Sequence, residues 1–411
     1  MIDLKYLREN SEKVSSGARS KNIEIDVSKI LEVDEKFRTL STEVQNLRAE
    51  RNNAAKERNI ERGKEIKAQL DGLEAELSNL ESQLKDLTSQ IPALPKDDVK
   101  VGKNDTENEV IKTVGEPTRF EFKPKDHLEL GELLDIIDVT RAAKVSGARF
   151  AYLKNEGALL EFALVQFAMA KLVGKGFKPV IPPTIISKDT MRAMGYMENG
   201  GDADMFHLQD EDKVLVGTAE QSIVPMHKDE VLDAKNLPLR YVGFSSSYRS
   251  EAGSYGKDTR GILRVHEFHK VEMVSYVAEG KDDEEHESLK SIEEELFSDL
   301  KIPYQVIKMC TGDLGFPAVR KYDIEAWIPT QEKYREVTST STTGDFQSRR
   351  LNIKYHEGGE KKYVNILNGT AYAIGRTLIA ILENFQQEDG SVVVPEVLTK
   401  YTGFDKISPK K

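Results

Sequence analysis

Residues 248–273, YRSEAGSYGKDTRGILRVHEFHKVEM, combine side chains and backbone freedom suited to binding a phosphate-bearing ligand. Arginine offers a rigid charged fork that matches a phosphate group, and glycine lets a loop approach a ligand closely. The cations and glycines of this stretch are Arg249, Lys257, Arg260, Gly253, Gly256 and Gly261. We therefore expect a flexible flap over a phosphate-bearing ligand.

The residues after this loop alternate between apolar and polar types, as in a strand with one buried face. One parity carries Leu263, Val265, Val271 and Met273, and the other carries Arg264, His266, Phe268, Lys270 and Glu272. An ordinary antiparallel hairpin with one face in water would give the same alternation. Phe268, an aromatic residue in the middle of the polar row, favours a binding site.

Composition limits the class of protein. The 411 residues suffice for two or three domains, and 59 basic against 70 acidic residues give a net charge of −11. Any nucleic-acid contact must therefore use a local basic patch. The single cysteine, Cys310, excludes an intramolecular disulfide and a multi-cysteine zinc site, and favours a reducing compartment. The N-terminus lacks the apolar core of a signal peptide, and the apolar stretch FALVQFAMAKLV contains Gln166 and Lys171, so we expect a cytoplasmic protein without a membrane segment.

Two heptad patterns predict a helical hairpin near the N-terminus. Their apolar positions, spaced alternately by three and four, are Ile30, Val33, Phe37, Leu40, Val44 and Leu47, then Ile66, Leu70, Leu73, Leu77, Leu80, Leu84, Leu87 and Ile91. The short break around ERNIERGKE indicates that the helices fold back on each other as an antiparallel coiled coil. Pro92 and Pro95 end the pattern, which places the arm at about 27–92 in an N-terminal domain of residues 1–100.

The charges of this hairpin differ between its tip and its stem. From Arg48 to Lys67 there are seven basic and four acidic residues, whereas both stem segments are acidic. A solvated coiled coil with incidental charge accounts for the stem, but a basic tip on an acidic protein indicates contact with an RNA backbone. The tip residues expected to contact RNA are Arg51, Lys56, Arg58 and Arg62.

Residues 101–117 are polar and aperiodic, which predicts a linker before a second domain at 118–411. In that domain GALLEFALVQFAMAKLVGKG predicts an amphipathic helix, FKPVIPPTII a strand, and LNGTAYAIGRTLIAILENFQ a strand, a glycine turn and a helix. Hairpin-like strands without regular βαβ alternation favour an antiparallel sheet over a Rossmann fold. The predicted class is α+β, with a helical coiled-coil hairpin followed by an antiparallel β-sheet domain flanked by helices.

Three segments of the second domain resemble, in order, motifs 1, 2 and 3 of class II aminoacyl-tRNA synthetases. They are the helix and strand that end at Pro183, the pair RSEAGSYGKDTRG and HEFHKVE, and NGTAYAIGRTL. With the arm and the stretches GTAEQ and KYDIEAWIPTQEKYREVTSTSTTGDFQSRR, nearly the whole chain resembles bacterial-type seryl-tRNA synthetases. The resemblance implies a ligase that uses ATP and Mg²⁺ to form seryl-adenylate from L-serine and then charges serine tRNA, with selenocysteine tRNA as a further substrate. It also implies a homodimer with tRNA bound across subunits.

The resemblance implies an ATP site on the polar strand face. Arg249 would grip the α-phosphate and the serine carboxylate, Glu251 would read the adenine amino group, and Phe268 and Arg376 would cover the two faces of adenine. Arg249, Glu251 and Arg376 are the implied catalytic residues. The implied ATP-binding residues are Arg249, Ser250, Glu251, Val265, Phe268, Glu336, Val337, Thr338, Ser339 and Arg376. Among them, Glu336 and Ser339 would hold Mg²⁺.

The resemblance also implies a serine site. Its residues are Thr218, Ala219, Glu220, Arg249, Glu272, Asn368 and Thr370. Such a site rejects alanine because its polar groups would be left unpaired, and it must exclude threonine by size. The chain departs from the family pattern at Thr370, often serine, and in a hairpin shorter than is usual in bacterial relatives.

Two other classes of protein share parts of this pattern. A catalytically silent paralogue would keep the arm as an RNA-binding module, but the residues implied for the chemistry are all present. A ligase that loads amino acids onto carrier proteins would resemble the second domain without the arm, so the coiled coil disfavours it.

Overall fold

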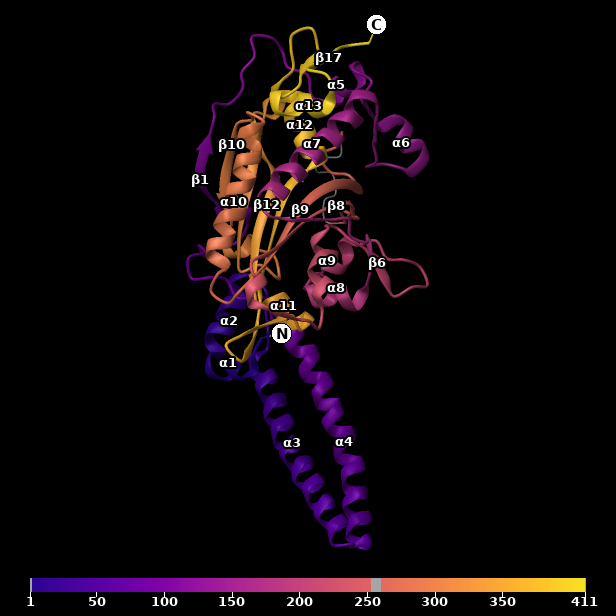
Figure 1. The fold of residues 1–411 in the computed structure, drawn as a ribbon, viewed down its shortest axis with the longest axis vertical. Helices are drawn as coiled ribbons and strands as arrows, with labels where there is room; N and C mark the ends of the chain where they lie inside the picture. The colour runs from indigo at the N-terminus through magenta and orange to yellow at the C-terminus, as the bar shows by residue number, and fades with distance from the viewer. Residues whose placement is uncertain (1, 253–259, 411) are drawn as a thin grey trace. The chain divides into compact units, whose positions relative to one another are not determined.

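The computed structural model describes residues 2–252 and 260–410, which form two compact units that divide between Leu94 and Pro95 (Figure 1). Unit 1 is helical, and unit 2 is built around a large sheet. We expected the first domain to extend to residue 100. The division comes earlier, directly before the second of the two prolines that follow the helical hairpin.

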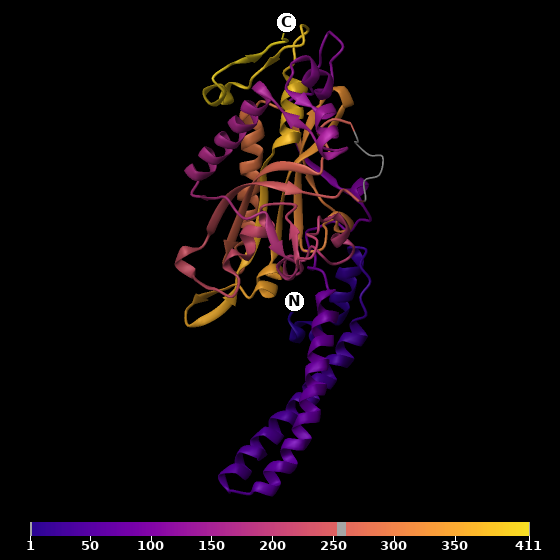
Figure 2. The same cartoon turned by 90° about the vertical axis from the view of Figure 1, so that its right-hand side faces the viewer.

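Unit 1 consists of α1 (Leu4–Glu9), α2 (Ser11–Ser20), α3 (Val27–Lys56) and α4 (Ile60–Ser89). The side chains of Asp26 and Asn59 cap α3 and α4 by accepting hydrogen bonds from the backbone N–H groups of Lys29 and Arg62. Arg58, with φ 56°, supplies a left-handed conformation in the short connection between the two long helices. This connection makes α3 and α4 an antiparallel hairpin, which Figures 1 and 2 both show.

The seam between α3 and α4 is buried where the heptad pattern predicts. Ile30, Val33, Val44, Ile66 and Leu70 are each at most 2% exposed. Both α1 and α2 join the base of this seam in one hydrophobic cluster. The predicted coiled-coil hairpin is confirmed.

Unit 2 is organised by an eight-stranded sheet. In spatial order its strands are β1 (Glu109–Val114), β10 (Tyr304–Lys308), β11 (Arg320–Ile328), β12 (Lys333–Gly344), β15 (Asn365–Ala373), β9 (Glu267–Val277), β8 (Leu239–Tyr248) and β4 (Lys178–Val180). All neighbouring strands are antiparallel except β4 and β8. The prediction of an antiparallel sheet is confirmed (Figure 2).

Helices and small sheets surround this framework. The helices are α5 (His127–Leu133), α6 (Val139–Ser146), α7 (Asn155–Gly174), α8 (Lys188–Met194), α9 (Glu220–Ile223), α10 (Asp282–Asp299), α11 (Phe346–Leu351), α12 (Ile374–Asn384) and α13 (Glu396–Thr402). The short strands are β2 (Ile137–Asp138), β3 (Tyr152–Leu153), β5 (Ile185–Ser187), β6 (Lys213–Leu215), β7 (Val231–Asp233), β13 (Lys354–Glu357), β14 (Glu360–Tyr363), β16 (Val392–Val393) and β17 (Lys406–Ile407). The 3₁₀ helices are η1 (Asp105–Glu107), η2 (Gly201–Asp204), η3 (Val224–His227), η4 (Ala234–Asn236), η5 (Thr311–Asp313) and η6 (Pro329–Gln331). The long helices α7, α10 and α12 share one hydrophobic cluster with the sheet.

The segment 101–117, which we expected to be a linker, contains the edge strand β1. Residues of β1 pair with β10, far along the chain. All of them except Val114 are exposed, which explains the polar composition of the segment. An edge strand needs backbone pairing but few apolar side chains. The segment is therefore part of unit 2.

Helix α7 is, within the described part of the chain, the one helix long and apolar enough to cross a membrane by length and composition. Leu160, Leu164 and Leu172 of this helix are fully buried in the cluster that it shares with the sheet. Leu159 and Phe162 lie at the surface of the chain, with exposed fractions of 50% and 57%. Helix α7 therefore has a core-facing side and an apolar outer side.

Candidate active site

The antiparallel strands β8 and β9 carry the polar face that the sequence predicts. Val271 and Met273 of β9 are fully buried on one side of the sheet. Phe268, Lys270 and Glu272 line pockets on the other side. The predicted alternation is therefore confirmed within β9.

The residues that precede β9 do not continue this alternation, because the strand begins only at position 267. Arg264 and Val265 are neighbours in sequence, yet both line the same pocket. The ring of His266 instead packs against Phe150 and Phe206. His266 therefore does not contribute to the polar strand face.

The expected flap is only partly described. Gly253, Gly256 and Lys257 lie outside the described residues. Arg249 follows β8 directly, and Arg260, which is 67% exposed at its side chain, forms an ion pair with Asp126.

Residues expected at an ATP site gather in one pocket, here named pocket A. Its lining includes Arg249, Glu251, Val265, Phe268, Glu336, Val337, Thr338, Ser339 and Arg376. Ser250 does not line pocket A, since its Oγ donates a hydrogen bond to the Ala203 carbonyl at 2.7 Å. The sheet thus brings three segments that are distant in sequence to one place.

Arg376, in the first turn of α12, forms an ion pair with Glu336 at 3.0 Å and donates to the Glu336 carbonyl at 3.1 Å. Desolvation opposes ionisation of Glu336, but Arg376 and Lys321 lower the pKa of this carboxyl below its ordinary value. Burial raises the pKa of Asp323, whose carboxylate lies 3.2 Å from Lys321 Nζ. Pocket A therefore holds the charged carboxylate of Glu336 beside cations.

Two arginine side chains of pocket A contact other residues of its lining. The guanidinium carbon of Arg249 is 5.3 Å from the centre of the Phe268 ring, within the range of a cation–π contact. Glu251 has a left-handed backbone with φ 53°, and its carboxylate lies 3.2 Å from Arg264. Phe268 therefore offers an aromatic surface beside the guanidinium group of Arg249.

A β-bulge brings Glu336 and Ser339 to the same side of β12. Residues three apart in a regular strand point to opposite faces. Here Thr338 pairs with Ile324 and Glu336 pairs with Glu325, so one residue of β12 has no partner opposite it. Glu336 and Ser339 both line pocket A and are only partly buried.

This pair fits Mg²⁺ better than a metal that needs a full set of protein ligands. Within residues 2–252 and 260–410, no group of three or more His, Cys, Asp or Glu side chains could hold a metal ion. Mg²⁺ commonly binds one or two protein oxygens and takes its other ligands from water and substrate phosphates. One carboxylate and one hydroxyl meet that need.

Most residues expected at a serine site line a second pocket, here named pocket B. They are Thr218, Glu220, Arg249, Glu272 and Asn368. Two expected residues lie elsewhere. The side chain of Ala219 is fully buried in a hydrophobic cluster, and Thr370 lines pocket A.

Lys270, which the sequence analysis did not assign to a site, links Glu272 and Thr370. Its Nζ lies 2.6 Å from Glu272 Oε2 and 3.4 Å from Thr370 Oγ1, and Thr370 Oγ1 donates to Glu272 at 3.2 Å. All three residues are buried. The signal for Lys270 was its place in the polar row between Phe268 and Glu272.

Glu220 is held by two neutral donors. Tyr196 OH donates to its Oε2 at 2.8 Å, and Gln347 Nε2 donates to its Oε1 at 3.0 Å. Burial raises the pKa of Glu220, although these two hydrogen bonds oppose the rise. Tyr196 and Gln347 were not predicted, because neither is adjacent in sequence to GTAEQ.

Pockets A and B are neighbours. Arg249, Lys270 and Ser339 line both of them. A guanidinium at this junction can contact two anionic ligands at once, one in each pocket. The arrangement suits a reaction between a carboxylate and a phosphate.

The tip of unit 1 presents most of the cations that the sequence predicts there. Arg51, Lys56 and Arg58 are exposed. Arg62 is also exposed, but its guanidinium pairs with Glu50 at 3.1 Å and Glu65 at 3.2 Å. Arg62 therefore contributes less positive potential than the other three.

Both units match described families. Residues 1–95 match the seryl-tRNA synthetase N-terminal domain, and residues 206–385 match the tRNA synthetase class II core domain (G, H, P, S and T). The serine–tRNA ligase of Dictyoglomus turgidum is 43% identical, and the match covers 100% of both chains.

Solved structures give the same result. Seryl-tRNA synthetase from Pyrococcus horikoshii, in complex with ATP, has a TM-score of 0.93, 40% identity and full coverage of both chains. The cytoplasmic serine–tRNA ligase from Naegleria fowleri, in complex with AMP, has a TM-score of 0.90 and 30% identity, and the match covers 100% of this chain and 99% of that one.

Proposed function

The chain belongs to the seryl-tRNA synthetase family, and we infer from this membership that it is a class II serine–tRNA ligase. We propose that it attaches L-serine to serine tRNA in two steps, through a seryl-adenylate. The observation that carries this proposal is the junction of pockets A and B at Arg249, where an amino-acid carboxylate and a nucleotide α-phosphate can meet. The ATP complex of the Pyrococcus horikoshii relative supports ATP as the nucleotide.

In the first step the serine carboxylate attacks the α-phosphate of ATP, and pyrophosphate leaves. Arg249 would bind both reacting groups, which replaces an encounter in solution by a fixed approach and stabilises the transferring charge. Arg376 would supply a second positive charge from the opposite wall of pocket A. In the second step a ribose hydroxyl at the tRNA terminus attacks the serine carbonyl carbon, and AMP leaves.

Adenine would lie on the ring of Phe268, with Arg376 over its other face. Glu251 would accept a hydrogen bond from the adenine amino group, and the backbone of Val265 would border the base. Glu336 and Ser339 would hold Mg²⁺, which would neutralise charge on the ATP phosphates. Support for this arrangement comes from their shared position in pocket A.

Serine would occupy pocket B. Glu220 and Glu272 would bind its polar groups, together with Thr218 and Asn368. A buried site built from such groups discriminates against amino acids that lack a hydroxyl, because its own hydrogen bonds would remain unmade. Thr370, through its bond to Glu272, would set the position of that carboxylate.

The helical arm would bind serine tRNA through shape and backbone contacts, with selenocysteine tRNA as a further substrate. The exposed cations at its tip support this role, since phosphate contacts are sequence-independent. In the family the arm lies across tRNA held by the partner subunit.

We further propose a cytoplasmic homodimer. Helix α7 and strand β4 form the region that resembles motif 1, and apolar side chains are exposed on α7 and directly after β4. Leu159, Phe162 and Ile181 have exposed fractions of 50%, 57% and 86%. Strand β4 also lies at the edge of the main sheet, where its outer backbone groups can pair with another chain. Sedimentation analysis of the wild type and of Phe162→Asp tests this proposal, since only the wild type should form dimers.

The decisive experiment is ATP–pyrophosphate exchange with each amino acid, followed by charging of serine tRNA. Serine-dependent exchange together with charging would support the proposal. A silent paralogue would show neither activity, and a carrier-protein ligase would show exchange without charging of tRNA.

A further inference from the structure

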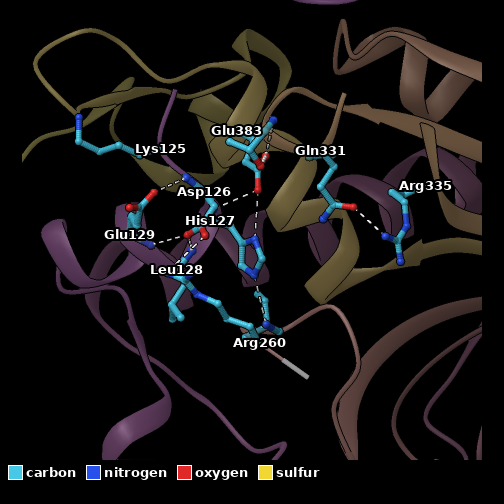
Figure 3. Close-up of polar contacts among 12 residues, drawn as sticks. Lys125, Asp126, His127, Leu128, Glu129, Arg260, Gln331, Arg335 and Glu383 are labelled. Atoms are coloured by element: carbon cyan, nitrogen blue, oxygen red, sulfur yellow. Dashed lines mark hydrogen bonds and ion pairs between the residues drawn. The ribbon is translucent and has the colours of Figure 1, made fainter. Parts of the chain in front are cut away.

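A segment outside the three motifs contacts the backbone of a residue that lines pocket A. The segment is the start of α5, where Asp126 pairs with Arg260 (Figure 3) and His127 contacts the backbone of Ile262. We propose that His127 is a positioning residue for the ATP site, acting through the Ile262 peptide. This inference rests on the proposed function of pocket A.

His127 Nε2 accepts a hydrogen bond from the Ile262 backbone N–H at 3.3 Å. A backbone N–H can only donate, so Nε2 must carry a lone pair and the proton of this neutral ring must lie on Nδ1. Nδ1 lies 3.1 Å from Glu383 Oε1 and donates to it. Glu383 therefore orients the imidazole so that its acceptor nitrogen, Nε2, faces the Ile262 N–H.

Glu383 is fully buried and has four donors. Its Oε1 accepts from the His127 backbone N–H and ring, and its Oε2 accepts from the Thr330 N–H at 3.2 Å and the Thr330 hydroxyl at 2.5 Å. Glu383 belongs to α12, the helix that also carries Arg376. The network therefore ties the segment before β9 to the helix that supplies a cation to pocket A.

The fit around this contact is close. Gly261 has φ 77°, and a Cβ atom added there would come 2.0 Å from His127 Nε2. On the other side of the same segment, the Ile262 carbonyl oxygen would be 3.4 Å from a Cβ added at Gly375, the residue before Arg376. Ile262 itself lines pocket A. The backbone of Ile262 is thus held at its N–H by His127 and bordered at its carbonyl by the start of α12.

Asp126 supports the same arrangement. Its Oδ1 accepts from the backbone N–H groups of Leu128 and Glu129 and so caps α5, while its Oδ2 lies 3.4 Å from Arg260. Asp126, the N-cap of α5, and His127, its first residue, therefore contact the segment on both sides of Gly261. A loss of this support should displace the wall of pocket A and leave pocket B intact, since no residue of this network lines pocket B.

The test compares His127→Ala with His127→Gln in serine-dependent pyrophosphate exchange. The alanine variant should raise the KM for ATP about tenfold, because a buried N–H is left without an acceptor, and change the KM for serine less than twofold. Glutamine can place its carboxamide oxygen near the position of Nε2, so it should restore much of the ATP affinity. Gln331→Ala is the matched control. Gln331 lines, together with His127, Arg260 and Glu383, a pocket beside this network, and its Oε1 accepts a hydrogen bond from Arg335 at 2.7 Å. The substitution removes that one hydrogen bond without touching the 260–262 segment.

Amide hydrogen exchange gives a readout that does not depend on catalysis. In the wild type the peptide that contains Ile262 should be protected, and its exchange should accelerate in His127→Ala but not in Gln331→Ala. An unprotected wild-type peptide, an unchanged KM for ATP in His127→Ala, or equal effects on the two KM values would overturn the inference. If Arg376→Ala retained normal exchange, the assignment of pocket A would fail instead, and protection of Ile262 would still report on the His127 contact.

Discussion

Glu272→Gln tests the proposed serine pocket with a minimal change of shape. Glu272 is 1% exposed and accepts hydrogen bonds from Lys270 at 2.6 Å and Thr370 at 3.2 Å. Glutamine keeps the volume and one acceptor oxygen but removes the negative charge. A hydrogen bond to a charged group contributes about 1.5–3 kcal/mol. We therefore expect kcat/KM for serine to fall about ten- to a hundredfold, with the KM for ATP changed little.

The same structure predicts the effect on stability. Lys270 is buried. Removing the only counter-charge of a buried cation lowers the free energy of unfolding by about 3–5 kcal/mol. Glu272→Ala should approach this range. Glu272→Gln should cost less, because the amide oxygen still accepts from Lys270. Urea unfolding of both variants measures the difference.

Serine-dependent pyrophosphate exchange, with serine and ATP varied in turn, is the assay for Glu272→Gln. Glu267→Gln is the matched control, since Glu267 lies on the same strand but is exposed and contacts the Tyr248 hydroxyl. Unchanged serine kinetics in a folded Glu272→Gln variant would refute the placement of serine in pocket B. Equal losses in both variants would show that the strand, and not the carboxylate, is responsible.

Three further outcomes are expected. Arg376→Ala should abolish adenylate formation without unfolding the protein, and near-normal exchange would contradict its role beside Glu336. Because burial raises the pKa of Glu220, this carboxyl takes up a proton at a higher pH than an ordinary glutamate. Acidification should therefore raise the KM for serine before ordinary glutamates titrate, and Glu220→Gln should remove that dependence. Alanine substitution of three other exposed tip cations should weaken tRNA charging, and it should lower the salt dependence of charging by about one counterion per lost phosphate contact. Pyrophosphate exchange should stay unchanged. Arg62→Ala alone should have little effect, because Glu50 and Glu65 already pair with Arg62. The three cations are Arg51, Lys56 and Arg58.

Sequence patterns predict the arm well because its structure is local. The heptad positions Ile30, Val33, Ile66 and Leu70 are buried as expected, since each contact lies within one hairpin. Strand β1 was not predicted because its partner is β10, far along the chain, and its exposed side chains carry no apolar signal. Pairing of edge strands is a tertiary event that local composition does not report.

In the site, too, sequence patterns predict what is local to one strand and miss what depends on tertiary contacts. Alternation predicts Phe268 and Glu272 on one face of β9, but no period in the sequence would place Glu336 and Ser339 together, because a bulge changes the parity between them. Family resemblance supplied that pair. The contact between His127 and the Ile262 peptide had no signal at all, because it joins a helix start to an irregular segment.

The shared lining of pockets A and B has a thermodynamic consequence. If Arg249 contacts both ligands, the free energy of binding one depends on whether the other is present. Linkage requires that this coupling be reciprocal: the factor by which ATP changes the affinity for serine must equal the factor by which serine changes the affinity for ATP. A non-hydrolysable nucleotide analogue and a serine analogue, titrated singly and together, would measure one coupling free energy from two directions, and replacing Arg249 should bring it toward zero.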